Sequence, residues 1–246
     1  MGFKTFTVFA SKRPGYFGTH PKHNSEWVDA TMHQLGLTGY ILVAHDVPFQ
    51  VYPKDKDLYI GVYAEGIAIA QIDLPAAFFD ERSRRRSFGR LPDMNDFKQK
   101  ILDRYAQGEV VALTLHSVVN LWGFSVFKDG NLIRSASGGD GEFLGSSGDP
   151  LPEEDAILKT YPIETLDPEH GGGEELVFEV ARRVFGKRFD EEDLEDVLRC
   201  SHYRMAPKAR STWSKLWTFW RTIADLPGLL FDVIFDAISR SRKIGK

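Results

Sequence analysis

The chain has 246 residues, of which 42% are hydrophobic and 27% charged, which are the values of an ordinary globular protein. It is long enough to bury a core, and its single cysteine, Cys200, excludes an internal disulfide. No run reaches the roughly 18 apolar residues that a membrane-spanning helix needs, and the first residues lack the pattern of a signal peptide. We therefore expect a cytoplasmic protein, with a peripheral position at the inner face of the membrane as the alternative.

Charge divides the chain into two unequal parts. From Arg204 onward, nine Lys or Arg stand against three Asp, whereas the preceding residues carry 22 basic and 32 acidic side chains. The sequence thus predicts an acidic body over residues 1–203 and a basic tail over residues 204–246. Because the body repels phosphate backbones, nucleic acid is not the expected partner.

The first half of the chain alternates strand and helix patterns. Residues 3–11, FKTFTVFAS, are apolar on both faces at their end, which is typical of a central strand. A helix is expected over residues 25–35, capped by Asn24 or Ser25 and ended by Gly36, with an apolar stripe of Trp27, Val28, Met32 and Leu35. A strand at 40–46 follows, and then a hairpin with strands near 58–63 and 67–72.

The middle of the chain predicts a helix, a strand and a hairpin in succession. The helix begins at Asp93 or Asn95, and the β-branched run 109–119 forms the strand. Asp129-Gly130 then lies between two alternating runs and indicates a two-residue hairpin turn. The turn predicts three cross-strand pairs, which are Phe127 with Leu132, Val126 with Ile133 and Phe124 with Ser135. It also predicts that one face of the hairpin, made of Trp122, Phe124, Val126 and Ile133, packs in the core.

Residues 137–155, SGGDGEFLGSSGDPLPEED, have the composition of a connecting loop. Helices are expected over 152–164, over 170–185 with Gly186 as the stop, and from the acidic residues near 191 to about 205. Strands in runs, without strict β-α-β alternation, predict an α+β fold. We expect a mixed or antiparallel sheet with helices packed on it, followed by a helical C-terminal tail.

The central segment resembles a family of uncharacterised bacterial proteins that carries only a domain-of-unknown-function label. The resemblance is carried by five features of the sequence: His116–Val119, the aromatic strand Trp122–Phe127, Asp129-Gly130, Arg134-Ser135 and the Pro-Leu-Pro loop Gly148–Pro152. It covers residues 1–185 in outline and implies a single α+β domain and a bacterial source. It brings no activity, cofactor or catalytic residue with it.

The glycine-rich segment and His116 form the weak catalytic candidate. His116 with Asp140 or Glu142 makes an acid–base pair if the loop folds back over the end of its strand. No phosphate-binding loop motif or G-x-S-x-G motif is present, and the carboxylates of the segment lack the spacing of a calcium loop. We expect no cofactor and no metal, and the histidines at 20, 23, 33 and 45 read as surface residues.

Five arginines, Arg82, Arg84, Arg85, Arg86 and Arg90, form a second candidate site. Arginine forks bind phosphate or carboxylate, so this segment could hold an anion or form ion pairs with the acidic loops. We prefer the ion pairs, because the surrounding body is acidic.

The tail carries the strongest expectation. Its apolar residues recur at helical spacing and would bury much aromatic surface: Trp213, Leu216, Trp217, Trp220, Ile223, Phe231, Ile234 and Phe235. This stripe could pack on its own body, on another protein chain or second copy, or in a membrane surface. The leading expectation is therefore a non-catalytic binding or assembly module that docks through its tail. The alternative is a hydrolase or ligand-binding enzyme that uses His116.

Overall fold

The computed structural model describes residues 2–80, 94–139, 142–163, 172–191 and 198–207. The chain divides into two compact units, Met1–Ala206 and Pro207–Lys246, and the description below concerns the first unit.

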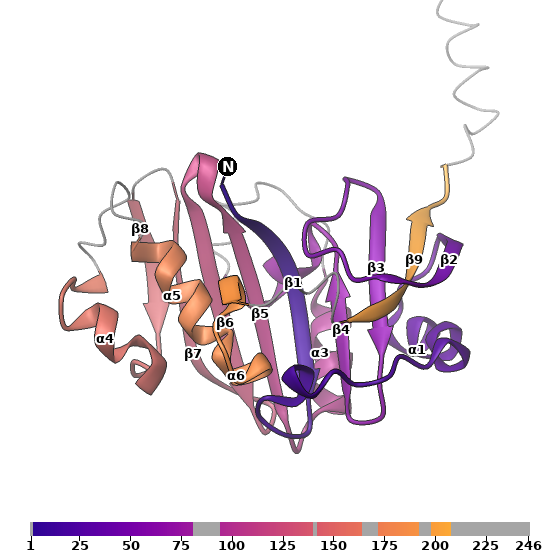
Figure 1. Ribbon diagram of the computed structural model, residues 1–246, viewed down its shortest axis with the longest axis horizontal. Coiled ribbons are helices and arrows are strands. Elements are labelled where there is room, and N and C mark those ends of the chain that lie inside the picture. The colour runs from indigo at the N-terminus through magenta and orange to yellow at the C-terminus, as the bar shows by residue number, and fades with distance from the viewer. Residues whose placement is uncertain (1, 81–93, 140–141, 164–171, 192–197, 208–246) are drawn as a thin grey trace, which may run out of the picture. The chain divides into compact units, whose positions relative to one another are not determined.

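A single antiparallel sheet of nine strands organises the described residues (Figure 1). Its spatial order is β2-β9-β3-β4-β1-β5-β6-β7-β8, so that β9 lies between two strands from the first quarter of the chain. The strands are β1 (Lys4–Ser11), β2 (Tyr40–Pro48), β3 (Asp57–Val62), β4 (Gly66–Ala70), β5 (Glu109–His116), β6 (Leu121–Lys128), β7 (Asn131–Gly139), β8 (Glu142–Ser147) and β9 (Arg199–Met205). The predicted α+β class is confirmed, and β1 occupies the central position that its two apolar faces favoured.

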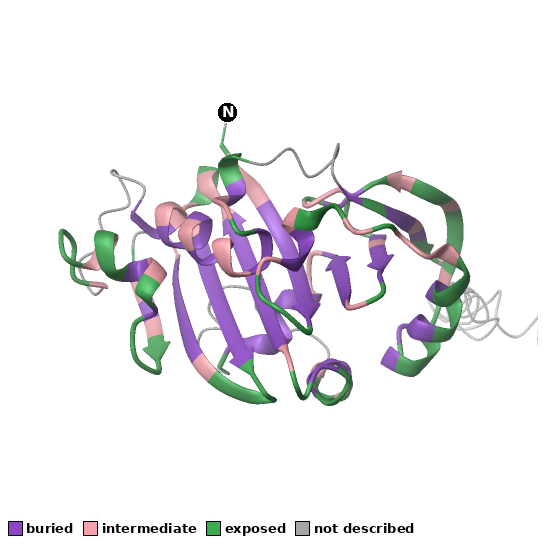
Figure 2. Cartoon of the chain, turned by 60° about the horizontal axis from the view of Figure 1, so that its bottom comes forward, coloured by how far each residue is buried: buried purple, intermediate pink, exposed green. Residues whose placement is uncertain are grey.

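Helices cover the two faces of the sheet and create two hydrophobic cores. The α-helices are α1 (Val28–Leu35), α3 (Asn95–Arg104), α4 (Asp155–Leu158), α5 (Gly172–Val180) and α6 (Arg182–Phe185). Residues of α5 and α6 pack with Phe9 and Phe124 on one face, whereas residues of α1 and α3 pack with Val8 and Ile60 on the other. Figure 1 shows α5 and α6 in front of the sheet and α3 behind it. Figure 2 shows that the central strands are the most deeply buried part.

The helix limits follow the local chemistry of the sequence. Asn24 Oδ1 accepts a hydrogen bond from Glu26 N at the first turn, and Gly36 ends α1 with a φ of 73°. Gly186 ends α6 in the same left-handed conformation, as predicted. Trp27, which we expected in the buried stripe, is instead 49% exposed and lies in the 3-10 turn that precedes α1.

The predicted hairpin at Asp129-Gly130 is confirmed, since both residues have a positive φ. Phe127 pairs with Leu132 as expected, but the next predicted pairs are wrong by one residue. An irregularity between Val126 and Phe127 shifts the register, so that Val126 pairs with Arg134 and Phe124 with Ala136. The expected core face survives the shift: Trp122, Phe124, Val126 and the partly buried Ile133 all pack in the same core.

Two further elements differ from the sequence prediction. The segment expected as a loop contains β8, an edge strand on β7, since glycine and serine are tolerated where only one side of the strand is paired. The segment expected as a helix up to residue 205 ends in β9, whose Cys200, Ser201 and Tyr203 are buried by the neighbouring strands and the layers packed on them. Strand β9 runs to Met205, two residues into the stretch that the sequence analysis assigned to the tail.

A buried ion pair fastens the segment after β8 to the sheet. The side chains of Arg134 on β7 and Glu154 are 3% and 0% exposed. Arg134 Nε donates to Glu154 Oε1 at 2.9 Å, and Nη2 donates to Oε2 at 2.8 Å. Glu154 Oε1 also accepts from Leu151 N, and Arg134 Nη1 donates to Gly148 O. The Arg-Ser and Pro-Leu-Pro features that carry the family resemblance thus meet at this pair.

Candidate functional site

The structure does not bring His116 and Glu142 together. His116 ends β5, and the ladder connects it through Leu121 of β6 and the end of β7 to Glu142 at the start of β8. Three strand spacings of about 4.8 Å separate the two backbones by about 14 Å, too far for a hydrogen bond between their side chains. The third member of the predicted set, Asp140, lies outside the described residues.

His116 instead has an aromatic neighbour. Its ring meets that of Tyr52 edge-on at 6.0 Å, and its Nδ1 is buried without a hydrogen-bond partner among the described residues. Strand pairing places Lys4 opposite it. Within the described ranges, no carboxylate forms a hydrogen bond with this buried nitrogen.

The arginines Arg82, Arg84, Arg85, Arg86 and Arg90 lie outside the described residues, as do the tail residues Trp213, Leu216, Trp217, Trp220, Ile223, Phe231, Ile234 and Phe235. The expectations for both sets stay predictions from the sequence.

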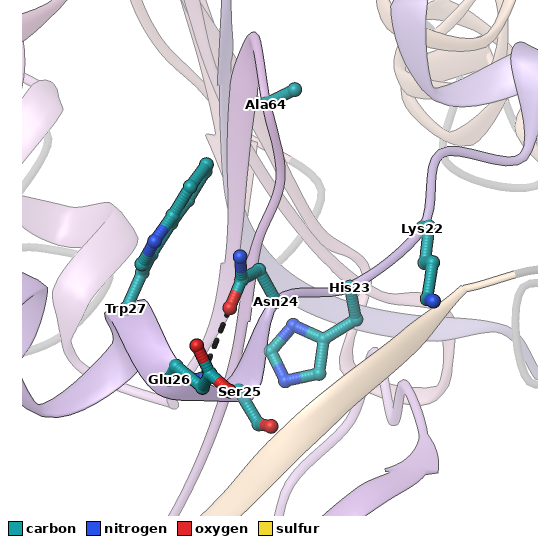
Figure 3. Close-up of a pocket in the computed structure, with 7 residues that line it drawn as sticks. All are labelled: Lys22, His23, Asn24, Ser25, Glu26, Trp27 and Ala64. Carbon is teal, nitrogen blue, oxygen red and sulfur yellow. Dashed lines mark hydrogen bonds between the residues drawn. The ribbon is translucent and has the colours of Figure 1, made fainter.

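A pocket of about 380 Å³ lies beside the first turn that leads into α1 (Figure 3). It is lined by consecutive residues of the preceding segment and by one residue of the β3–β4 turn: Lys22, His23, Asn24, Ser25, Glu26, Trp27 and Ala64. The Trp27 side chain extends along one side toward Ala64, and the His23 ring lies on the other side beyond Asn24 (Figure 3).

His23 connects this pocket to two other strands through a serine. Its Nε2 lies 3.0 Å from Ser201 Oγ on β9, and the same hydroxyl lies 2.7 Å from His45 Nδ1 on β2. His23 Nδ1 accepts from Val62 N at 3.2 Å in the tautomer that leaves Nε2 protonated. In that tautomer His23 Nε2 donates to Ser201 Oγ, and Ser201 Oγ donates to His45 Nδ1.

This histidine–serine network connects three segments of the fold, and its serine is not placed to act as a nucleophile. Burial is the main cause that lowers the pKa of His23, and it favours the neutral ring that the network needs. Ser201 is fully buried, so its hydroxyl has no open path to a substrate. No group of three or more His, Cys, Asp or Glu within the described ranges is arranged to hold a metal ion. The sequence analysis missed the network because Ser201 lies 156 residues or more from both histidines.

A second polar group lies on the opposite face of β9. Arg204 Nε donates to Asp57 Oδ1 at 2.7 Å, and His202 stacks on Tyr59 with ring centroids 4.4 Å apart. The hydrogen bond from Arg204 is the largest cause that holds the pKa of Asp57 below its ordinary value. This group stabilises the pairing of β9 with β3.

The most unusual surface of the described residues is the edge formed by β2. Ile41, Leu42 and Val43 are 58%, 41% and 51% exposed, and Met205 on the neighbouring strand is 38% exposed. We call strand β2, with these exposed side chains, the open edge of the sheet. Ile41 pairs with Arg204 and Leu42 with Tyr203, so successive residues of β2 expose apolar side chains on opposite faces of the sheet.

The sequence contained one signal for this surface. The run YILVA of residues 40–44 is apolar without alternation, which is typical of a strand buried on both faces. The structure places that run at the margin of the sheet instead, with β9 on one side only. A strand composed like an interior strand therefore lies at an edge.

Among the described residues, no helix has the length and apolar character needed to cross a membrane. A search of curated proteins found no match, and neither did a search of solved structures. The model of a family of unknown function, DUF6928, matches residues 6–182. This match spans most of the chain, from the central strand β1 to α6, and includes the hairpin and the buried ion pair. The chain therefore belongs to the DUF6928 family of unknown function.

Proposed function

We propose that this protein is a non-catalytic binding module that takes a partner β-strand on the open edge of β2. The observation that supports the proposal is the exposure of three consecutive large apolar residues, Ile41, Leu42 and Val43, on an edge strand. The proposal keeps the cytoplasmic setting and the assembly role expected from the sequence.

An open sheet edge presents backbone N–H and C=O groups that another strand can pair with. Proteins that stay monomeric usually protect such an edge with charged residues or proline. Residues 40–44 of β2 contain neither, whereas the opposite edge strand, β8, begins at the exposed Glu142 and contains glycine and serine. Two differently composed edges fit a protein that uses only one of them.

The described residues favour binding over catalysis. Among the described residues, no carboxylate binds the buried Nδ1 of the candidate base His116, and both ring nitrogens of His23 at the pocket are engaged in the histidine–serine network. The hydrolase alternative and the docking of the tryptophan-rich tail stay predictions from the sequence.

Site-specific photo-crosslinking in the native host tests this proposal. A photo-reactive phenylalanine derivative replaces Leu42 in the full chain, and the matched control replaces Leu132, which is 43% exposed but lies beside the hairpin turn of β7. We expect a discrete covalent adduct from position 42 and none from position 132. No adduct from position 42, or equal adducts from both positions, would refute the proposal.

A further inference from the structure

We propose that the strand bound at the open edge is β2 of a second copy of this chain, paired antiparallel about a two-fold axis at Leu42. The inference rests on the proposed function and names its partner.

The hydrogen-bond pattern of β2 permits this pairing. Ala206 N donates to Gly39 O at 2.7 Å, and Tyr40 pairs with Met205 in the ladder to β9. In an antiparallel ladder, alternate residues direct both backbone groups to the same neighbour. The backbone N–H and C=O groups of Gly39 and Ile41 therefore form hydrogen bonds with β9. Those of Tyr40 and Leu42 point to the open side of β2.

A two-fold axis at Leu42 makes the two copies of this residue a hydrogen-bonded pair. Each Leu42 N–H then donates to the C=O of the other, with the Cα atoms about 5.5 Å apart. The same axis sets Ile41 of one copy opposite Val43 of the other. One face of the joined sheets would gather four β-branched side chains, and the other face would gather the two leucines, which are the contacts that stabilise a sheet.

Charge does not oppose this contact. An isologous interface brings each charged group near its own copy, so identical charges near the axis repel. Residues 38–44, TGYILVA, carry no charged side chain. The axis sets the first carboxylate beyond them, Asp46, opposite the uncharged Thr38 of the other copy.

The far half of β2 limits the pairing to this short stretch. The ladder to β9 is irregular between Leu42 and Ala44 and again between Ala44 and Val47, and Asp46 has a φ of 55°. Pro48 then ends the strand. These features prevent a long strand from extending along β2 and confine a symmetric partner to the five residues 40–44 centred on the axis, with the irregularity at Val43 lying inside that stretch. The polar edge at β8 keeps the assembly closed as a dimer.

The molecular mass of the full chain in solution, measured by light scattering over a range of concentrations, tests the inference. We expect the mass of two chains for the wild-type protein and for Leu132→Asp, and the mass of one chain for Leu42→Asp. A wild-type monomer, an unchanged mass for Leu42→Asp, or an equal loss in both variants would overturn the inference.

Two further variants of Leu42 test the geometry. Leu42→Pro removes only the N–H on the open side, where an edge strand tolerates proline, so the fold should persist by circular dichroism. Two hydrogen bonds are lost per dimer, and we expect the dimer to weaken about tenfold to a hundredfold. Leu42→Cys should form a disulfide between copies under mild oxidation, since the expected Cα separation suits one, whereas Leu132→Cys should not. A Leu42→Cys protein that stays reduced, or a dimer unaffected by Leu42→Pro, would contradict the pairing.

The two proposals fail separately. A photo-adduct of Leu42 with a different protein, together with a monomeric full chain, keeps the open edge as a binding surface and rejects the second copy. The absence of any adduct rejects both.

Discussion

The buried pair of Arg134 and Glu154 offers a sharp test of how this fold is held together. Glu154→Gln keeps the shape of the side chain and removes its charge. The guanidinium of Arg134, which is 3% exposed, then keeps only Gly148 O and one side-chain amide oxygen as acceptors and has no buried counter-charge. The new amide NH₂ also faces donors, since both Arg134 and Leu151 N donate to the native carboxylate.

The expected cost follows from this geometry. Removing one partner of a buried ion pair costs about 3–5 kcal/mol, because the remaining charge stays desolvated. For a domain of this size, that loss lowers the melting temperature by about 6–20 °C. The exposed pair of Lys100 and Asp96 provides the control, with side chains 38% and 79% exposed. Asp96→Asn should cost at most about 0.5 kcal/mol.

Denaturant unfolding of each variant measures these differences, with thermal melting as the second readout. The double variant Arg134→Met/Glu154→Leu should be more stable than Glu154→Gln, since it leaves no unpaired charge in the core. If Glu154→Gln unfolds within about 0.5 kcal/mol of the wild type, the reasoning from burial is wrong.

Three other predictions concern single residues. Gly148→Ala should lower the melting temperature far more than Gly130→Ala. Both glycines have a φ near 78°, but only a Cβ at 148 would meet a backbone oxygen, at 2.0 Å. Equal melting temperatures of the two variants would contradict this prediction. Asp57 has a lowered pKa, so its stabilising effect is complete above the unfolded pKa near 3.8 and disappears as the pH falls through the folded value. The stability difference between wild type and Asp57→Asn should therefore shrink below about pH 4, and acid titration of unfolding checks this. Burial lowers the pKa of His23 in the folded state, so the imidazole is protonated at a higher pH in the unfolded chain than in the folded one. The free energy of unfolding should therefore decline as the pH falls below about 6.5. His23→Gln should flatten that decline between pH 7 and 5, and an unchanged slope would assign it to other groups.

Local signals in the sequence predicted much of the sheet. The Asp129-Gly130 turn, the central β1 and the hairpin of β3 and β4 each depend on patterns within about 20 residues, and all three are confirmed. The stops at Gly36 and Gly186 follow from the same kind of signal, because a left-handed helix end favours glycine.

The features that local patterns missed depend on distant partners. The register shift between Val126 and Phe127 brings Arg134 opposite Val126, and Arg134 binds Glu154, which lies 20 residues further on. Strand β9 follows acidic residues that favour a helix start, yet its place between β2 and β3 decides its conformation. Of the candidate site residues, His116 and Glu142 lie at the same end of the sheet without contact, and the network around Ser201 could not be read from spacing at all.

The insertion of β9 between β2 and β3 also has a consequence during synthesis. Until residues 199–205 leave the ribosome, β2 has no neighbour within its own chain, and β3 forms the margin of the nascent sheet. Such late, long-range pairing slows folding and leaves apolar strands uncovered for the time of translation. The apolar run of residues 40–44 therefore stays without a strand neighbour from its own chain until the last strand of the sheet has been synthesised.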